Sequence, residues 1–479
     1  METLTDQTVI DRLFDRINYE RQTPIAAGDF KLSNMIRLLE CLGNPQLKRP
    51  VIHVAGTKGK GSVCAIAAAI LEAAGYRAGI YSSPHLERVN QRIVFGGAEI
   101  SDTQLINVLK EIEPAVQQID EIADQQGSKR LTFFEVITTA AFQFFATHPI
   151  DVVILEVGMG GRLDSTNLCQ PEICVITNIS LDHTRQLGST VDKIAAEKAG
   201  IIKPGVPVIS GVRDPLAREV IRQVASEKNA PLTELDEDFE LRQSASDVNR
   251  FSCFGMENLS CNLIGQHQQV NAAIAIAACR QLAQSDSWTI AEPVIRQGLA
   301  SATLPGRCEL VSLQPGNPGS RTQNGAAPAA TAKSPVLHVL SVLLDMAHNE
   351  ASSAALAETL SQLPERKNAQ KRIMIFAATR DKDIEAMLRP LVGLFDHIIF
   401  TKYQENPRGR LATELREIAE QVFSAQGTPE SRPDVTIADS PQTAWAQALE
   451  SCESELFICI TGSAFLVAEL RPTVRELSG

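Results

Sequence analysis

The chain has 479 residues, with 45 lysines and arginines against 57 aspartates and glutamates, which gives a formal net charge of −12. This length predicts about two to four domains, and a hydrophobic content of 44% excludes wholesale disorder. The acidic balance argues against nucleic acid as the main partner. Without an apolar run of about 18 residues or a signal peptide, we expect no membrane partner and a cytoplasmic protein.

The cysteines indicate a reduced protein. Ten of them are scattered along the chain without any C-x-x-C pair. Several, such as Cys64, Cys174 and Cys459, stand within apolar runs. Free cysteines pack as small apolar residues, so we interpret them as core residues rather than as disulfides or zinc ligands.

In the first half, apolar runs typical of strands alternate with helical stretches. A helix is predicted over 62–75, where Gly75 would end it. Continuous apolar strands separated by helices are typical of an α/β fold with a parallel sheet covered on both faces. The predicted strands are 50–55, 77–83, 151–157, 172–180 and 206–212.

The second half has the same alternation and no internal sequence repeat, which favours two α/β domains over one duplicated unit. A helix is predicted over 268–283, and we place the domain boundary at the following turn, so that the domains are 1–303 and 304–479. Residues 312–335 are rich in Gly, Pro, Ala and Ser and are predicted to form a flexible, solvated insertion. The predicted strands are 337–345, 372–379, 397–401, 434–439 and 456–462.

The sequence VIHVAGTKGKGS at 51–62 leads from an apolar strand through a glycine-rich turn into a helix. Gly56, Gly59 and Gly61 permit backbone angles that would close the turn around a polyphosphate. Lys60 would place its charge at the β- and γ-phosphates. The Ser62 hydroxyl would face Mg²⁺ at the positive end of the helix.

This turn departs from the strict G-x-x-x-x-G-K-[ST] pattern, because the first glycine is absent and a glycine separates the lysine from the serine. The alternative is a simple glycine-rich turn, but strand, turn, lysine and helix together favour nucleotide phosphate binding. A second glycine cluster, at 156–162, fails the dinucleotide pattern because Leu163 occupies its last place, which excludes NAD.

Polar residues stand where three predicted strands end, and ligands bind beyond the carboxyl ends of strands in open parallel sheets. Glu156 is predicted either to bind Mg²⁺ beside the phosphates or to form an ion pair, because a buried carboxylate needs a partner. His183 is either a ligand or a structural histidine. Ser83 follows the strand 77–83. By composition alone, Lys198 would be an ordinary surface lysine.

These residues resemble the Mur ligase superfamily and, within it, the folylpolyglutamate synthase/dihydrofolate synthase family. The similarity runs in order over most of the chain. The matching stretches are HVAGTKGKGS (53–62), YSSPHL (81–86), FFE (133–135), ILEVGMGGRLDSTN (154–167), LDHT (181–184), EKAGIIK (197–203), LPGR (304–307), DMAHN (345–349), RDKD (380–383) and PRGR (407–410). The segment QHQQVN (266–271) matches more loosely.

The resemblance implies an N-terminal ATP-binding domain with a phosphate loop and a parallel sheet, followed by a smaller Rossmann-like glutamate-ligase domain. It implies that ATP phosphorylates a substrate carboxylate, and that the amino group of L-glutamate attacks the resulting acyl phosphate. Folate or dihydropteroate would be the acceptor. Two Mg²⁺ ions, lysines and arginines would neutralise the charge, and we expect a monomer.

The resemblance also implies roles for individual residues. ATP would be bound by Thr57, Lys58, Gly59, Lys60, Gly61, Ser62, Asn271, Arg307 and Asp345. The metal ions would be bound by Ser62, Ser83, Glu156 and His183. The pterin would be contacted by Thr132, Phe133, Phe134, Glu135, Arg162, Leu163 and Asp164. Catalysis would depend on Lys60, Lys198, His348 and Arg307. Lys198 would be carbamylated, since a carbamate is an anionic oxygen ligand whereas an ammonium repels Mg²⁺.

Some of these roles have a structural alternative. Arg307 either clamps phosphate from the hinge turn LPGR or is a solvated linker arginine. His348 either faces the glutamate and acyl phosphate together with Asn349, or caps the following helix. Phe133 and Phe134 either stack on a pteridine or belong to the core.

Two other functions are alternatives to an amide ligase that acts on folate. A Mur-type ligase acting on a cell-wall nucleotide precursor would require an additional UDP-binding domain, for which too little chain precedes the phosphate loop. A regulatory nucleotide-binding protein would have lost Glu156, His183, Lys198 or His348, and all four are present. Lys58 stands where many relatives have asparagine, and an additional positive charge beside phosphates is tolerable.

Overall fold

The structure is a computed structural model that describes residues 5–18, 32–182, 184–244, 249–313, 340–426, 432–450 and 455–477. Contacts divide the chain into two compact units. The first comprises Met1–Ser244, Arg250–Asn262 and Gln268–Thr303, and the second comprises Ala245–Asn249, Leu263–His267 and Leu304–Gly479. Of the predicted insertion, Ser312 and Leu313 are described as the end of a strand, and residues 314–335 lie outside the described ranges.

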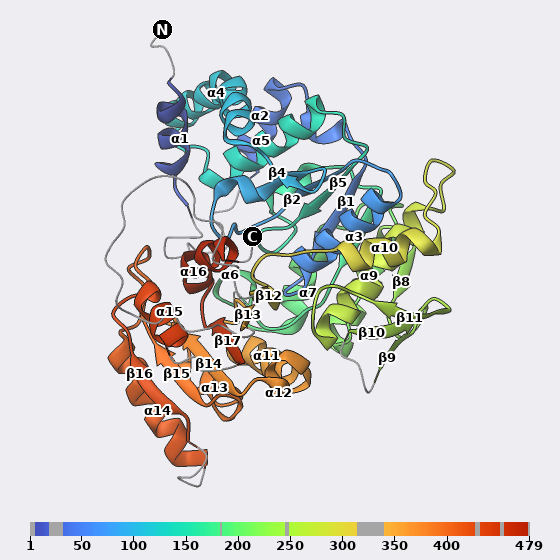
Figure 1. Ribbon diagram of the computed structural model, residues 1–479. Coiled ribbons are helices and arrows are strands. Elements are labelled where there is room, and N and C mark those ends of the chain that lie inside the picture. Colours follow the sequence, from blue (N-terminus) through green and yellow to red (C-terminus); the bar gives the residue numbers. More distant parts are fainter. Residues whose placement is uncertain are drawn as a thin grey trace, which may run out of the picture. The chain divides into compact units, whose positions relative to one another are not determined.

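The first unit contains an eight-stranded sheet in the order β4-β3-β2-β5-β1-β6-β7-β8 (Figure 1). The strands from β2 to β8 in this order are parallel, whereas β3 and β4 add an antiparallel edge. The strands are β1 (Val51–Ala55), β2 (Ala78–Tyr81), β3 (Ile93–Phe95), β4 (Ala98–Glu99), β5 (Val152–Glu156), β6 (Ile173–Ile176), β7 (Val208–Ser210) and β8 (Leu232–Glu234).

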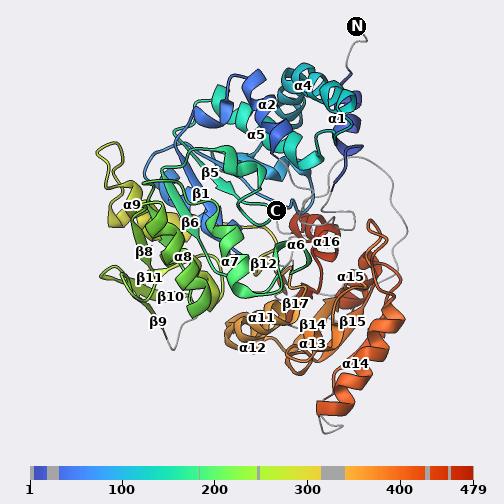
Figure 2. The same ribbon diagram turned by 180° about the vertical axis from the view of Figure 1, so that it is seen from behind.

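Helices cover this sheet and bury the apolar strands. Figure 2 shows α1, α2, α4 and α5 grouped together, and their core includes Val51 of β1 and Leu155 of β5. A second core joins α7 and α8 to β6 and β7. The helices are α1 (Asp6–Phe14), α2 (Ser33–Cys41), α3 (Lys60–Ala73), α4 (Asp102–Gln125), α5 (Phe133–Thr147), α6 (Thr184–Leu187), α7 (Val191–Ala199), α8 (Pro215–Glu227), α9 (Gln266–Leu282) and α10 (Glu292–Ser301). Short 3₁₀ turns are η2 (Pro45–Leu47), η3 (Val89–Arg92) and η4 (Ser165–Leu168).

A small antiparallel sheet, which the sequence did not predict, also belongs to the first unit. It has the order β11-β10-β9. Its strands are β9 (Leu241–Gln243), β10 (Arg250–Cys253) and β11 (Met256–Ser260). They mix apolar and polar residues, so they lack the continuous apolar runs of the main sheet.

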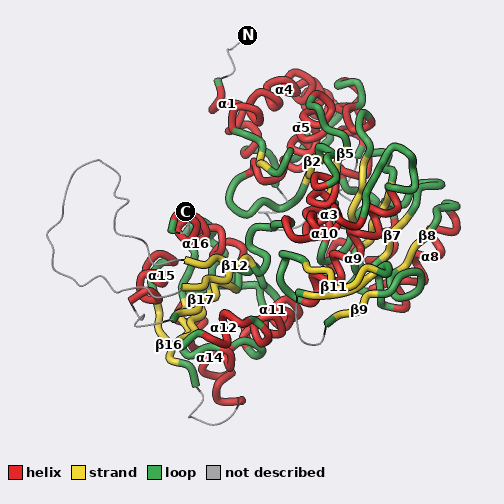
Figure 3. The backbone as a smooth tube through the Cα atoms, turned by 45° about the vertical axis from the view of Figure 1, so that its right-hand side comes forward, coloured by secondary structure: helices red, strands yellow, loops and turns green. Residues whose placement is uncertain are grey.

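The second unit is built on a six-stranded sheet in the order β12-β13-β17-β14-β15-β16, and Figure 3 shows its strands beside one another. The edge strand β12 is antiparallel to β13, and the other pairs are parallel. The strands are β12 (Glu309–Leu313), β13 (Leu340–Leu344), β14 (Lys371–Phe376), β15 (His397–Phe400), β16 (Asp434–Ile437) and β17 (Leu456–Thr461). The helices are α11 (Glu350–Gln362), α12 (Pro364–Asn368), α13 (Ile384–Leu388), α14 (Ala412–Gln426), α15 (Pro441–Glu450) and α16 (Ala464–Glu476), with the 3₁₀ turn η5 (Val392–Leu394).

The predicted α/β class is confirmed, and each strand predicted from an apolar run overlaps an observed strand. The largest difference is the run 172–180, where β6 ends at Ile176. Gly75 has a φ of +89° directly after the end of α3, as the prediction required. Eight of the nine described cysteines are buried, and Cys41 is exposed. None of the helices in the described ranges combines the length and the apolar composition that crossing a membrane requires.

Candidate active site

The loop that is predicted to bind phosphate, residues 56–62 and called the phosphate loop below, follows β1 and requires glycine at two positions. Gly56 has a φ of +153° and Gly59 a φ of +86°. A Cβ atom would lie 1.9 Å from Thr177 Oγ1 at the first position, and 2.3 Å from Asn271 Oδ1 at the second. Any residue with a Cβ atom would therefore clash at both positions.

Gly61 does not have the predicted role in closing the turn. The helix α3 begins at Lys60, after Gly59 as its N-cap, so Gly61 lies in the first helical turn. Its φ is not in the positive region. The buried Ser62 is also in this turn, where unpaired amide groups and the helix dipole favour an anion.

The segment that follows β6 braces the phosphate loop. The Thr177 hydroxyl donates to the Lys58 carbonyl at 2.6 Å, and the Lys58 amide donates to Asn178 Oδ1 at 2.8 Å. The Thr57 amide donates to the Asn178 carbonyl at 2.8 Å. These contacts fix the loop before any ligand binds. Sequence reasoning missed Thr177 and Asn178 because it assigned both to a strand.

The structure brings Asn271 to the phosphate loop. This residue of α9 is buried, and its Nδ2 donates to Gln268 Oε1 at 2.9 Å. Its other amide atom, Oδ1, faces Gly59, since that atom is the nearest neighbour of an added Cβ there. The amide is therefore held in one orientation beside the start of α3.

Lys198 is not a surface lysine. It lies at the end of α7 and is only 4% exposed, and its Nζ donates to the Gly56 carbonyl at 2.8 Å. Burial, followed by the charge of Lys60, lowers the pKa of Lys198 to about 7, although Asp182 and Asp164 oppose the shift. A large fraction of this side chain is thus an uncharged amine near neutral pH.

Glu156 and Ser83 lie next to each other at the ends of neighbouring strands. Glu156 is the last residue of β5 and is 7% exposed, and its Oε2 accepts a hydrogen bond from the Ser83 amide at 3.3 Å. A carboxylate with serine hydroxyls is a set of hard oxygen donors, which fits Mg²⁺ once phosphate oxygens are added. His183 lies outside the described residues.

Thr132 and Glu135 form a capping box at the start of α5. Thr132 Oγ1 accepts from the Glu135 amide at 3.2 Å, and Glu135 Oε2 accepts from the Thr132 amide at 2.8 Å. Burial raises the pKa of Glu135. Both side chains therefore cap the N-terminus of α5.

Of the two alternatives for the aromatic pair, the core alternative holds for Phe133. Its ring is fully buried and stacks on Phe14 with 5.8 Å between the centroids. The ring of Phe134 is half-buried and lies against Gly158, where an added Cβ would be 2.6 Å from its Cζ. Phe134 thus borders the glycine-rich loop after β5.

Three consecutive residues of the loop after β5 that were predicted to contact the pterin differ in their exposure to solvent. Arg162 is exposed and pairs with Glu197 at 2.8 Å, and Leu163 is half-buried. The Asp164 carboxylate is buried and accepts from the Gly158 and Met159 amides, both at 3.0 Å. Burial raises the pKa of Asp164, while its hydrogen bonds oppose the shift.

In the second unit, Asp345 joins the LPGR turn to the DMAHN loop. This buried carboxylate accepts from the Cys308 amide and from the Ala347 amide, both at 2.9 Å. The Met346 amide donates to the Gly306 carbonyl at 3.1 Å. Asp345 and the Met346 amide therefore hold the backbone on the two sides of the exposed Arg307.

Glu309 holds the same turn from its other side. Its Oε2 accepts from the Gly306 amide at 2.7 Å and from Arg471 Nε at 2.8 Å. Arg475 of α16 donates to its Oε1. Burial alone would raise the pKa of Glu309, but the bonds and charges of these partners outweigh it, and the pKa lies below the usual value.

The structure excludes the helix-capping alternative for His348. The N-cap of α11 is Asn349, whose Oδ1 accepts from the Ser352 amide at 3.0 Å. His348 is exposed and its Nδ1 lies 3.0 Å from the Met346 carbonyl. Since a carbonyl can only accept, Nδ1 carries the proton, and in the neutral ring Nε2 is the basic nitrogen.

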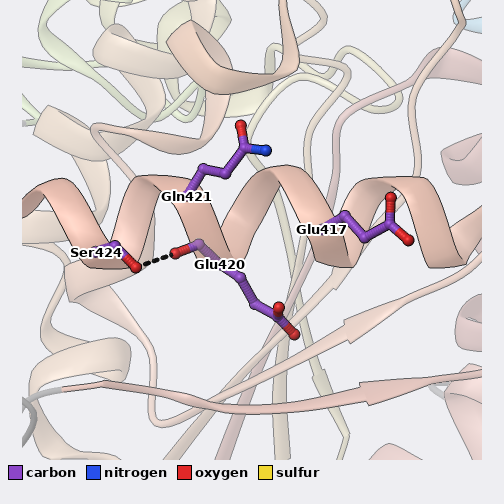
Figure 4. A pocket seen from close by; sticks show the side chains of 4 residues that line it. All are labelled: Glu417, Glu420, Gln421 and Ser424. Atoms are coloured by element: carbon purple, nitrogen blue, oxygen red, sulfur yellow. Dashed lines mark hydrogen bonds between the residues drawn. The ribbon is translucent and has the colours of Figure 1, made fainter.

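A surface hollow on α14 offers no comparable set of groups. It is lined by Glu417, Glu420, Gln421 and Ser424, all exposed and all on this one helix (Figure 4). The Ser424 hydroxyl donates to the Glu420 carbonyl of its own helix at 2.8 Å. These residues lack the buried polar atoms that mark the phosphate loop.

Comparisons with known proteins agree with this arrangement. The profile of the Mur ligase middle domain matches residues 54–279, and that of the dihydrofolate synthetase C-terminal domain matches residues 332–474. Both profiles belong to ATP-dependent ligases, which is the class of enzyme that the fold and the phosphate loop define.

Individual relatives resemble the chain over nearly its whole length. It is 34% identical to the dihydrofolate synthase/folylpolyglutamate synthase of Bacillus subtilis, covering 93% of this chain and 95% of the relative. A structure of the Mycobacterium tuberculosis folylpolyglutamate synthase with ADP is similar with a TM-score of 0.79 and 28% identity, covering 98% of each chain. Escherichia coli FolC with DHPP and ADP has a TM-score of 0.75 and 30% identity, covering 99% of each chain. The chain belongs to the dihydrofolate synthase/folylpolyglutamate synthase family.

Proposed function

We propose that this chain joins L-glutamate to the carboxylate of a folate, and of dihydropteroate, while ATP is converted to ADP and phosphate. The observation that supports this most strongly is the phosphate loop. Its two glycines, Gly56 and Gly59, are enclosed by Thr177 and Asn271, and a buried carboxylate, Glu156, ends the strand next to β1. The activities named for the relatives supply the substrate class.

The reaction brings two anions together, so positive charge and hydrogen-bond donors must converge. Lys60 and the amide groups of residues 57–62 bind the phosphates at the start of α3. A carboxylate oxygen of the acceptor then bonds to the γ-phosphorus, and ADP leaves. The amine of glutamate attacks the acyl carbon, loses one proton and displaces phosphate.

We assign the second unit two roles in the same reaction. The guanidinium of Arg307, whose turn is held by Asp345 and Glu309, binds phosphate oxygens. When the ring of His348 is neutral, its Nδ1 carries the proton that is donated to the Met346 carbonyl, and its Nε2 is unprotonated. That nitrogen accepts the proton which the attacking amine loses.

Glu156, Ser62 and Ser83 would hold one Mg²⁺, and His183 with a carbamylated Lys198 would hold a second. These ions neutralise phosphate charge when bound. The low pKa of Lys198 supports the modification, because the uncharged amine is the form that attacks the carbon of CO₂. The amine then loses a proton, which leaves an anionic carbamate. Phe134, Arg162, Leu163 and Asp164 remain the proposed contacts on the pterin side.

A phosphate-release assay with ATP, Mg²⁺, L-glutamate and either dihydropteroate or tetrahydrofolate tests the function. We expect release only when all components are present, and a product whose mass has increased by one glutamate residue. Release that does not depend on the pteridine acid would contradict the proposal. A nucleotide-linked cell-wall precursor in the same assay tests the alternative acceptor.

A further inference from the structure

A histidine stands in the middle of β1, a strand of the first unit in which every residue is buried. His53 of β1 is fully buried and pairs in register with Leu155 of β5 and Cys174 of β6. Burial, followed by the charge of Lys203, lowers the pKa of His53 to about 3, so its ring is neutral at physiological pH. A polar ring in such a place is costly unless it makes a hydrogen bond.

The ring bonds to a threonine from a distant segment. His53 Nε2 lies 2.9 Å from the hydroxyl oxygen of Thr166 in η4. That hydroxyl donates to Asp164 Oδ1 at 2.5 Å. A hydroxyl has one proton, so towards His53 it can only accept. The order of donation is therefore from His53 to Thr166 and from Thr166 to Asp164.

The last acceptor in this series, Asp164, fixes the glycine-rich loop after β5. Its Oδ1 also accepts from the Thr166 amide at 2.9 Å. Its Oδ2 accepts from the Gly158 and Met159 amides at the start of the loop. The carboxylate thus ties together both ends of residues 157–166, and its orientation depends on the Thr166 hydroxyl.

We infer that His53 and Thr166 are positioning residues for binding of the pteridine acid, acting through Asp164 and the loop 157–166. This inference rests on the proposed function, in which Arg162, Leu163 and Asp164 contact the pterin. His53 lies in β1, the strand that leads into the phosphate loop. The series of hydrogen bonds thereby links the strand before the ATP-binding loop to the loop that receives the acceptor.

Substitution of Thr166 tests the inference. Thr166→Val keeps the shape of the side chain and removes the hydroxyl, so we expect the KM for the pteridine acid to rise about tenfold, whereas the KM for ATP changes less than about twofold. In hydrogen exchange followed by mass spectrometry, the amides of 158 and 159 should exchange about tenfold faster. Thr166→Ser keeps the hydroxyl and should restore both values.

Thr401→Val is the matched control. Thr401 directly follows β15 and is buried, and its hydroxyl has no partner among the described residues. It should leave both KM values unchanged. If Thr166→Val does not fold, His53→Leu and His53→Gln supply the same comparison, because glutamine can still donate from its amide. We expect the leucine variant to show the rise in KM and the glutamine variant to show less of it.

Two outcomes would overturn the inference. One is a folded Thr166→Val or His53→Leu variant that has a lower melting temperature but an unchanged KM for the pteridine acid, as a purely structural role predicts. The other is unchanged exchange of the amides at 158 and 159. Failure of the proposed function would instead be seen in the unsubstituted chain, which would make no amide product, while the exchange experiment would still decide whether the series of hydrogen bonds holds the loop.

Discussion

The side-chain nitrogen of Lys198 donates a hydrogen bond of 2.8 Å to the backbone carbonyl of Gly56, the residue at which the phosphate loop leaves β1. The two residues are 142 positions apart in the sequence. The proposed site of carbamylation therefore touches the backbone of the proposed ATP site directly. Any change in the charge or size of this side chain reaches the loop without an intermediate residue.

The buried Lys198 should make the free energy of unfolding dependent on pH. Its folded pKa, about 7, lies below the value of 10.5 in the unfolded chain, so between these values the unfolded state binds more protons and stability rises with pH. Below pH 7 both states are protonated and this contribution is constant. We expect Lys198→Met to flatten the rise between pH 7 and 10 in urea unfolding curves measured without CO₂. Lys193→Met, at an exposed position of α7, should not alter it.

Activity should depend on the same lysine. Lys198→Ala removes the proposed carbamate, so we expect a loss of kcat of about a hundredfold or more. Short carboxylic acids added to the assay should partly restore turnover, because their oxygens can occupy the vacated place. A variant with full kcat would refute the metal-binding role. Carbamylation would be refuted if the intact mass of the unsubstituted chain under CO₂ did not increase by about 44 Da, the mass of the added CO₂.

Lys60 should matter for turnover and little for stability. Since it lies partly exposed at the start of α3, Lys60→Ala should keep its melting temperature and lose about a hundredfold to a thousandfold in kcat. Lys228→Ala removes an exposed lysine at the end of α8 and serves as the control. An unchanged kcat for Lys60→Ala would contradict the phosphate assignment.

Two glycines with the same backbone angle separate strain from function. Gly59 and Gly75 have φ values of +86° and +89°, but only Gly59 has a neighbour that an added Cβ would strike. Each alanine variant should cost about 1–2 kcal/mol of stability through backbone strain. Only Gly59→Ala should also weaken nucleotide binding, measured by calorimetry with ADP. Equal ADP affinities for both variants would show that Asn271 does not need to approach this turn.

Glu309, which holds the turn that carries Arg307, should contribute to the free energy of unfolding. Glu309→Gln removes the charge that Arg471 and Arg475 bind, so we expect the free energy of unfolding at neutral pH to fall by about 2 kcal/mol. The pKa of Glu309 is depressed, so its contribution is complete above the unfolded pKa and is lost as the pH falls through the folded pKa. The difference from the unsubstituted chain should therefore shrink in acid. Glu385→Gln, in an exposed pair with Arg389, should cost little.

The strands that have continuous apolar runs, and the glycine turn at 56–59, could be predicted from the sequence because their signals are local. The apolar run 152–155 is followed directly by Glu156, and the glycines at 56 and 59 reveal their turn directly. The strands β3, β4 and β8 to β12 were not predicted, since strands that are very short or of mixed polarity resemble loops.

The contacts that complete the site join residues far apart in the sequence. Asn178 binds Lys58 across 120 positions, and His53 meets Thr166 across 113. Spacing in a single sequence carries no sign of such pairs. The burial of Phe133 was open for a similar reason, because an aromatic residue at the start of a helix can face either the core or a ligand.

The antiparallel pairing of β12 with β13 has a consequence for protein engineering. Leu313 and Leu340 are partners in the register, so the chain between them leaves and re-enters the sheet at one edge. The entropy of closing such a connection grows only with the logarithm of its length. Foreign sequence, such as a fluorescent reporter or an affinity tag, could therefore be spliced between these two leucines while the six-stranded sheet keeps its hydrogen bonds.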